Sequence, residues 1–269
     1  MPSLSIEPNE RVTFRVAYRD DELVVVDKPA RVVTQPGLGH ERDSLLNGLF
    51  AAYGTLLQNL GRSRDFGLLH RLDRDASGLV MVALSGRAYD TLRQAFERGE
   101  VKKYYWALVR GAPNAPKGLI RKPIVEETTG RKLARVSPTG KAAVTAYRVL
   151  ETTPAGSLLE CRTLTGRLHQ LRVHLRSIGC PIMGDTFYGS RPVRASAPRL
   201  ALHAHRIVTR HPLTDQRLDV ASRWPSDLRA TLRRAGLARP DLPGPASDDA
   251  EGSEDSQPQS QPESHEQRS

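Results

Sequence analysis

The sequence predicts an α+β fold: a single domain built on a mixed, mainly antiparallel sheet that is flanked by helices and loops. Three observations favour this class. Stretches typical of strands dominate the chain, helical stretches interrupt them irregularly, and no segment repeats at a fixed period. At 269 residues the chain could form one large domain or two small ones, with an ample core in either case.

Strands are predicted from apolar, β-branched and aromatic runs bounded by turn residues. They span residues 12–18, 23–26, 79–84, 102–109, 143–150, 158–164 and 200–208. Six consecutive apolar residues at 79–84 predict a strand buried on both faces, entered through a turn at Ser77-Gly78. A second turn, at 153–156, separates two of the later strands.

Helices are predicted where apolar residues recur at helical spacing behind a capping residue. Ser44 caps a helix through Phe50, and Ser85 caps a second helix that Gly99 ends. Two further helices are predicted at residues 169–178 and 228–237. Among the remaining segments, 54–67 is polar and rich in glycine, 112–123 is a loop, and 124–141 is a polar hairpin.

The predicted organisation is an N-terminal extension of residues 1–11, a catalytic domain of residues 12–238, and a disordered acidic tail of residues 239–269. The tail is rich in Pro, Ser, Gln and acidic residues and almost lacks apolar ones. It conceals part of the positive charge: the whole chain carries +10, whereas residues 1–239 hold 39 basic against 22 acidic residues, a net charge of +17. Such a body favours a polyanionic partner, most simply nucleic acid.

Cysteine content and hydropathy indicate the compartment. The two cysteines, Cys161 and Cys180, form no disulfide framework and no cysteine-based zinc site. No apolar run reaches the length of a membrane span, and the first residues have no signal-peptide pattern. We therefore expect a soluble cytoplasmic protein without a membrane association.

The run His70–Met81 is the most informative stretch. It places Asp73 between Arg71 and Arg74, on a tight connection that leads into the buried strand at 79–84. A carboxylate there could be held rigidly toward a substrate, and the two arginines could attract an anion. Taken alone, however, an Arg/Asp-rich loop is more often simply solvated.

Two other stretches gain meaning beside it. At 164–175 a strand enters a Thr-Gly turn and a helix leaves it, which aims backbone N–H groups and the Arg167 guanidinium at an anion over the helix start. At 102–111 strand alternation places Tyr105 on the face opposite Tyr104 and Trp106; one of these faces should pack on the core, and the other could offer a ring that stacks on a base. Alone, the first could be an ordinary capped helix and the second an aromatic core strand.

Together these stretches closely resemble the RluA-type family of RNA pseudouridine synthases. The shared motifs are HRLD-x-x-x-SGL, a basic x-Y-x-A-x-V-x-G strand and TGR-x-HQ-[LI]-R-x-H, in this order. Three further stretches are similar to the family. They are the strand before Lys28-Pro29, the G-x-P-I-x-G-D-x-x-Y-G loop at 179–189, and the LHA…HP element at 202–212. The resemblance covers roughly residues 12 to 225.

The resemblance implies a fold with a central RNA-binding cleft and assigns roles to eight residues. Asp73 would be the essential catalytic carboxylate, either a nucleophile or a base. Tyr105 would stack on the flipped uracil and relay a proton, Arg167 would pair with Asp73, and Leu171 would line the uracil pocket. We expect phosphate contacts from Arg71, Arg74, His169 and Arg172.

Ala76 and Leu168 depart from the family pattern, which puts only the fine geometry of the pocket in doubt. About 11 residues precede the first strand, so we expect no additional N-terminal RNA-binding domain. No cofactor and no metal is expected, although His203 and His205 would share one strand face. The expected activity is that of a monomeric isomerase converting uridines of structured RNA, ribosomal more than transfer RNA, to pseudouridine.

Two alternatives stay open at this point. The chain could be a catalytically inactive RNA-binding or ribosome-assembly protein of the same fold, although such a protein needs no carboxylate facing RNA phosphate. It could also be a metal-dependent hydrolase acting on RNA or nucleotides, which metal analysis of the purified protein would test.

Overall fold

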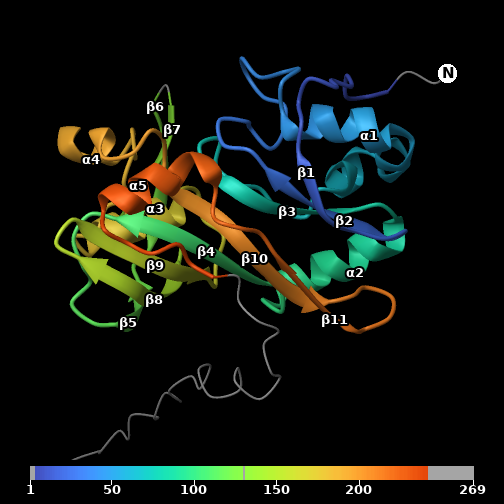
Figure 1. Ribbon diagram of the computed structural model, residues 1–269. Helices are drawn as coiled ribbons and strands as arrows, with labels where there is room; N and C mark the ends of the chain where they lie inside the picture. Colours follow the sequence, from blue (N-terminus) through green and yellow to red (C-terminus); the bar gives the residue numbers. More distant parts are fainter. Residues whose placement is uncertain (1–3, 130, 242–269) are drawn as a thin grey trace, which may run out of the picture.

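The computed structural model describes residues 4–129 and 131–241, and its centre is one long twisted sheet (Figure 1). Strand order is β1-β2-β3-β10-β4-β9-β8-β5, and β11 pairs with β10 outside this path. All neighbouring strands run antiparallel except β3 and β10. The predicted α+β class with a mixed, mainly antiparallel sheet is confirmed.

The strands of this sheet are β1 (Arg15–Arg19), β2 (Leu23–Lys28), β3 (Ser77–Ala83), β4 (Lys102–Val109), β5 (Lys117–Arg121), β8 (Val144–Thr153), β9 (Gly156–Thr163), β10 (Leu202–Arg210) and β11 (Arg217–Ala221). A separate hairpin consists of β6 (Ile124–Thr129) and β7 (Arg131–Val136), and it projects at the top of Figure 1. The core lies along β2, β3, β4 and β9, whose apolar side chains are almost completely buried.

The helices lie along the two sides of the sheet (Figure 1). They are α1 (Leu45–Leu60), α2 (Gly86–Glu97), α3 (Gln170–Ser177), α4 (Arg191–Ala195) and α5 (Arg229–Arg234), with short 3-10 segments η1 (Arg62–Gly67) and η2 (Ser226–Leu228). Ser44 and Ser85 cap α1 and α2 through their side chains, as predicted. No helix in the described part of the chain has the length and apolar character to cross a membrane.

The parallel contact between β3 and β10 positions the loop that carries Asp73. It consists of two register pairs, His203 with Ser77 and Ala204 with Gly78. The backbones come so close that a Cβ on Gly78 would lie 2.3 Å from the carbonyl oxygen of Ala204, and Gly78 has a φ of +119°. Only glycine meets both requirements. The Ser77-Gly78 pair, predicted to be a turn, is therefore the first part of the strand.

Three other predictions differ from the structure. The segment 112–123, predicted to be a loop, contains the edge strand β5, which pairs with β8. Its Lys, Gly and Arg residues hide the pattern because an edge strand buries few side chains. Helix α1 continues past Phe50 to Leu60 across a kink at Tyr53, because Leu57 and Leu60 keep its buried face. The terminal helix is shorter than predicted, spanning only Arg229–Arg234.

The predicted chain ends are described in part. Residues 4–11, predicted to be an extension, contact the domain: the Asn9 N–H donates to the carbonyl of Asn47, and Leu4 and Ile6 pack against the core. Of the predicted disordered tail, residues 242–269 lie outside the described residues.

Candidate active site

A cleft of about 2630 Å³ runs across the sheet, and all eight residues predicted for the site line it. Asp73, Tyr105 and Arg167 are among them, with Arg71, Arg74, His169, Leu171 and Arg172. Thirteen of the lining residues are Lys or Arg, against five Asp or Glu. The cleft is thus the strongly basic surface that the net charge of the chain led us to expect, and it suits a polyanion.

The buried ammonium of Lys28 holds the loop that carries Asp73 from the side of the protein interior. Lys28 is completely buried, and its Nζ donates to the carbonyl oxygens of Val32 at 2.7 Å, Ala76 at 2.8 Å and Pro29 at 2.9 Å. The carbonyl of Arg74 lies at 3.3 Å. Burial lowers the pKa of Lys28 to about 7, and the charges of Asp73 and Asp75 oppose that shift. One side chain therefore ties the end of β2 to the backbone on both sides of Asp75.

His70 fixes the entry to the same loop. Its Nε2 accepts a hydrogen bond from the backbone N–H of Met81 at 3.1 Å, and its ring lies 5.4 Å from the Phe96 ring. Nε2 must therefore be unprotonated. Burial lowers the pKa of His70 to about 3, and the charge of Lys103 adds to this effect. The motif thus begins with a neutral histidine that serves as a hydrogen-bond acceptor.

Asp73 lies at the end of a chain of three charges. Its Oδ2 is 3.3 Å from a terminal nitrogen of Arg172, whose guanidinium also holds Asp185 with two bonds of 2.9 and 2.8 Å. The Arg172 side chain is 2% exposed and that of Asp185 1%, whereas that of Asp73 is 22% exposed. Burial alone would lower the pKa of Arg172, but the bonds and charges of Asp185 and Asp73 raise it above its ordinary value. The permanently charged guanidinium thus has two partner carboxylates, and of these two Asp73 is the one that reaches solvent.

This arrangement differs from the predicted pairing. Arg167 was expected to pair with Asp73 and Arg172 to contact phosphate, but in the described residues the partner of Asp73 is Arg172. The Nε of Arg167 instead donates to the carbonyl of Ala142 at 3.0 Å. The reason is the helix geometry: Arg167 precedes α3 on the turn, while Arg172 lies in its first turn, facing inward.

The turn that carries Arg167 is itself fixed by Gln170. The Gln170 amide oxygen accepts from the Thr165 hydroxyl at 2.7 Å and from the Arg167 N–H at 3.1 Å. Its amide nitrogen donates to the carbonyl of Val144 and the hydroxyl of Thr145. Arg167 therefore lines the cleft from a rigid backbone.

Tyr105 lines the cleft from β4, and the neighbouring Tyr104 lines it too. Tyr105 is 7% exposed, while its neighbour Trp106 packs on the opposite face against His205, with parallel rings 3.9 Å apart. Burial raises the pKa of the Tyr105 phenol well above its ordinary value, and the charge of Asp73 adds to this. The phenol is therefore protonated at neutral pH and lies within electrostatic reach of Asp73.

The other predicted residues surround this centre. His169 has a left-handed backbone with a φ of 50°, and its Nδ1 lies 2.7 Å from the Tyr188 hydroxyl. Burial lowers the pKa of His169, although the charge of Asp73 opposes the shift. Leu171 is buried at the cleft wall, and Arg71 and Arg74 are exposed at its rim.

Sequence reasoning assigned no role to Lys28, Asp185 or Tyr188. The Gly184-Asp185 pair and Tyr188 were recognised as part of a motif, but nothing in the sequence says which arginine meets that carboxylate. One signal was available for Arg172: it lies next to Leu171 and one turn before Leu175, so it borders the apolar face of the helix.

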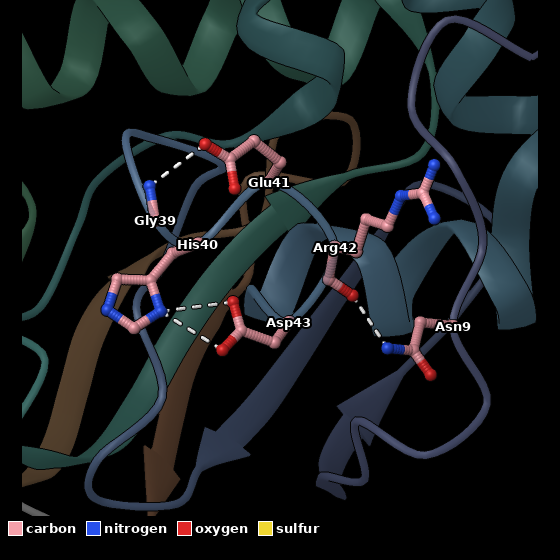
Figure 2. A pocket seen from close by; sticks show the side chains of 6 residues that line it. All are labelled: Asn9, Gly39, His40, Glu41, Arg42 and Asp43. Carbon is pink, nitrogen blue, oxygen red and sulfur yellow. Dashed lines mark hydrogen bonds and ion pairs between the residues drawn. The ribbon is translucent and has the colours of Figure 1, made fainter.

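A second, smaller hollow of about 500 Å³ lies at the loop before α1, and Figure 2 shows its lining. Its polar groups bond one another: His40 Nδ1 contacts the Asp43 carboxylate at 3.0 Å, and the Asn9 amide donates to the Arg42 carbonyl at 2.6 Å. Within the described residues, no group of three or more His, Cys, Asp or Glu could hold a metal ion. The large cleft is therefore the candidate site.

Comparison with known proteins defines the class. The family model for RNA pseudouridylate synthases matches residues 22–177. Two solved human structures, RNA pseudouridylate synthase domain containing 4 and domain containing 1, superpose with TM-scores of 0.66 at 25% identity. The match with domain containing 4 covers 84% of this chain and 95% of the human chain. The match with domain containing 1 covers 89% and 94%, respectively. The fold is that of a pseudouridylate synthase domain.

Curated relatives narrow this further. The ribosomal large subunit pseudouridine synthase D of Nitrosomonas europaea is 39% identical over 83% of this chain and 66% of its own length. The synthase of the same name from Vibrio cholerae is 37% identical, over 80% of this chain and 68% of its length. An uncharacterized RNA pseudouridine synthase of Mycobacterium bovis is 37% identical over 81% of this chain and 71% of its length. The chain belongs to the RluA-type RNA pseudouridine synthases and is an isomerase, which confirms the resemblance noted in the sequence.

The neutral state of His70 predicts an acid-sensitive stability. The folded-state pKa is about 3 and the ordinary value is 6.5, so between these values the unfolded chain binds more protons. The stability contributed by neutral His70 is complete above pH 6.5 and is lost as the pH falls toward 3. We expect the free energy of urea unfolding to fall as the pH is lowered, with His70 supplying up to about 1.4 kcal/mol per pH unit.

His70→Gln is the matched variant, because its amide oxygen can accept the Met81 bond without titrating. Its stability should fall less steeply between pH 6.5 and 4.5 than that of the wild type. Equal slopes for the two proteins would contradict the assignment.

Proposed function

We propose that this enzyme converts particular uridines of structured RNA to pseudouridine, with Asp73 as the essential carboxylate. The observation that carries the proposal is the position of Asp73: partly exposed in a basic cleft, paired with the buried Arg172 and close to Tyr105. In this isomerisation the bond between ribose C1′ and uracil N1 breaks, the base turns, and C1′ bonds to C5. C5 loses its proton and N1 gains one, so substrate and product contain the same atoms.

Each residue can be given a part in this reaction. The Asp73 carboxylate acts on the ribose or the base, as nucleophile or as base. Arg172 holds it in place from within the core. The neutral phenol of Tyr105 stacks on the flipped uracil and relays the C5 proton, while Leu171 covers the base from the apolar side.

The basic side chains at the rim would hold the RNA backbone. Arg71, Arg74 and Arg167 line the cleft around Asp73, where cations can contact phosphates, and His169 beside them can donate a hydrogen bond. In this proposal Arg167 contacts RNA, and the pairing role first expected of it belongs to Arg172. Relatives named for the large ribosomal subunit favour ribosomal RNA over transfer RNA as the substrate.

Asp73→Ala should abolish pseudouridine formation and leave the fold and RNA binding intact. The protein should still fold because Arg172 keeps both bonds to Asp185. Pseudouridines are mapped across the RNA of a deletion strain that is complemented with the wild type or with the variant. The uridines modified only by the wild type identify the target. Modification close to the wild-type level in the Asp73→Ala strain would refute the role of Asp73.

Tyr105→Phe should lower turnover far more than binding, because the ring still stacks but the hydroxyl is lost. A decrease of about 100-fold or more in kcat is expected for a lost proton relay. Tritium release from RNA labelled at uracil C5 measures turnover, and filter binding measures affinity. Unchanged turnover would remove the proton-relay role.

Arg172→Lys should damage the enzyme much more than Arg167→Lys. A lysine cannot hold Asp185 with two bonds and also reach Asp73, and a misplacement of ~1 Å can cost ~100-fold in rate. A lysine at position 167 can still donate to the Ala142 carbonyl and attract phosphate. Single-turnover rates of the two folded variants decide between them, and a larger loss in Arg167→Lys would restore the pairing predicted from the sequence.

A further inference from the structure

A buried chain of hydrogen bonds runs beneath the start of β3, outside the cleft. The Ser77 hydroxyl lies 2.9 Å from His203 Nδ1, and His203 Nε2 lies 3.2 Å from the Ser222 hydroxyl. Ser222 in turn lies 2.5 Å from a carboxylate oxygen of Asp27. Ser77, His203 and Ser222 are 5%, 2% and 1% exposed. None of the four lines the cleft, and none has a part in the chemistry proposed above.

The direction of these bonds follows from the carboxylate at one end. Asp27 accepts only, so the Ser222 hydroxyl donates to it and uses its oxygen to accept from His203 Nε2–H. Nδ1 then has a free lone pair, which accepts the Ser77 hydroxyl. The chain needs a neutral imidazole, and burial lowers the pKa of His203 to about 4, an effect that the charge of Asp27 opposes. Each member therefore has a defined role as donor and acceptor.

The position of His203 in the sheet explains why a side-chain link is used here. Along this edge of β10, β3 pairs only at His203 and Ala204, and β11 takes over from Arg206 onward. Ser222 directly follows β11, and its N–H donates to the carbonyl of His205 at 2.7 Å. His203 thus lies at the junction between two strands that share one edge. There the backbone pairing of β3 is short, and the side chains add bonds to it.

The same junction is where the loop with Asp73 enters the sheet. Ser77 is four residues after Asp73, and the Ala76 N–H closes a turn onto the Asp73 carbonyl at 3.2 Å. Lys28, next to Asp27 on β2, holds the carbonyl of Ala76 at 2.8 Å. Two consecutive residues of β2 therefore hold the end of the loop, one directly and one through Ser222 and His203.

We infer that His203 is a positioning residue for Asp73: by accepting the Ser77 hydroxyl, it sets where the loop lies and so brings the carboxylate to Arg172. The inference rests on the proposed role of Asp73 in catalysis. It gives the His203 side chain a task separate from core packing, since packing alone predicts that kcat follows thermal stability and does not depend on the bond to Ser77 itself.

Two substitutions of His203 separate the two ends of the imidazole. The amide oxygen of His203→Asn lies where Nδ1 was and can accept from Ser77, but Asn does not reach Ser222. The amide nitrogen of His203→Gln lies where Nε2 was and can donate to Ser222, but Gln leaves the Ser77 hydroxyl unpaired. Ser77→Ala removes the same bond while leaving His203 intact.

For each variant we would measure kcat and KM on the RNA that the wild type modifies, the melting temperature, and hydrogen exchange of residues 70–77. His203→Gln and Ser77→Ala should lower kcat at least about tenfold with a nearly unchanged KM, and speed exchange of the loop. His203→Asn should retain most of kcat, and hydrogen exchange of its loop should stay as slow as in the wild type. All three variants should lose some thermal stability.

Wild-type kcat in His203→Gln would overturn the inference. The inference would also be overturned if kcat fell equally in the Asn and Gln variants and in proportion to their loss of melting temperature. Such a result is expected when the ring only packs in the core. A wild-type protein that modifies no RNA would instead refute the proposed function. In that case, equal loop exchange in the Asn and Gln variants would still overturn the positioning role.

Discussion

The rest of the site depends on the ion pairs that the Arg172 guanidinium forms with Asp185 and Asp73. The guanidinium lies inside the protein, bonded twice to Asp185 and once to Asp73, and the rings of Phe187 and Tyr188 lie 4.9 and 5.0 Å from it. Removing one partner from a buried ion pair costs about 3–5 kcal/mol, since the other charge stays desolvated. Helix α3, the loop after Gly184 and the loop before β3 must therefore come together around one side chain.

This arrangement divides the charges between structure and chemistry. Asp185 satisfies most of the guanidinium, and its Oδ1 also accepts the N–H groups of Phe187 and Tyr188. Asp73 accepts a single long bond of 3.3 Å from Arg172 and keeps one edge open to the cleft. Lys28 and His70 secure the backbone on either side. The carboxylate that we propose as reactive is therefore held in place by groups that need not move during the reaction, a preorganisation that favours catalysis.

Much of this could be predicted from the sequence, and the failures have physical causes. The buried run at 79–84 and the Ser44 and Ser85 caps are local signals, and the structure has the strand and both helices. The choice between Arg167 and Arg172 is not local, because the partner carboxylates lie about 13 and 99 residues from Arg172 in sequence. Strand β5 was missed because its side chains are mostly exposed, and Lys28 because a lysine after a strand is usually solvated.

The parallel pairing of β3 with β10 also has a consequence for synthesis on the ribosome. Ser77 and His203 are 126 residues apart, and Ser222, which completes their contacts, follows later still. Bringing such distant segments together carries a loop-closure cost that local hairpins such as β8–β9 avoid. While the chain emerges, β2 and β3 can already pair, but the loop with Asp73 lacks its far support until β10 and β11 have left the exit tunnel. The nascent protein can thus pair its first strands early, while the loop with Asp73 gains its contact with His203 only after β10 and β11 have emerged.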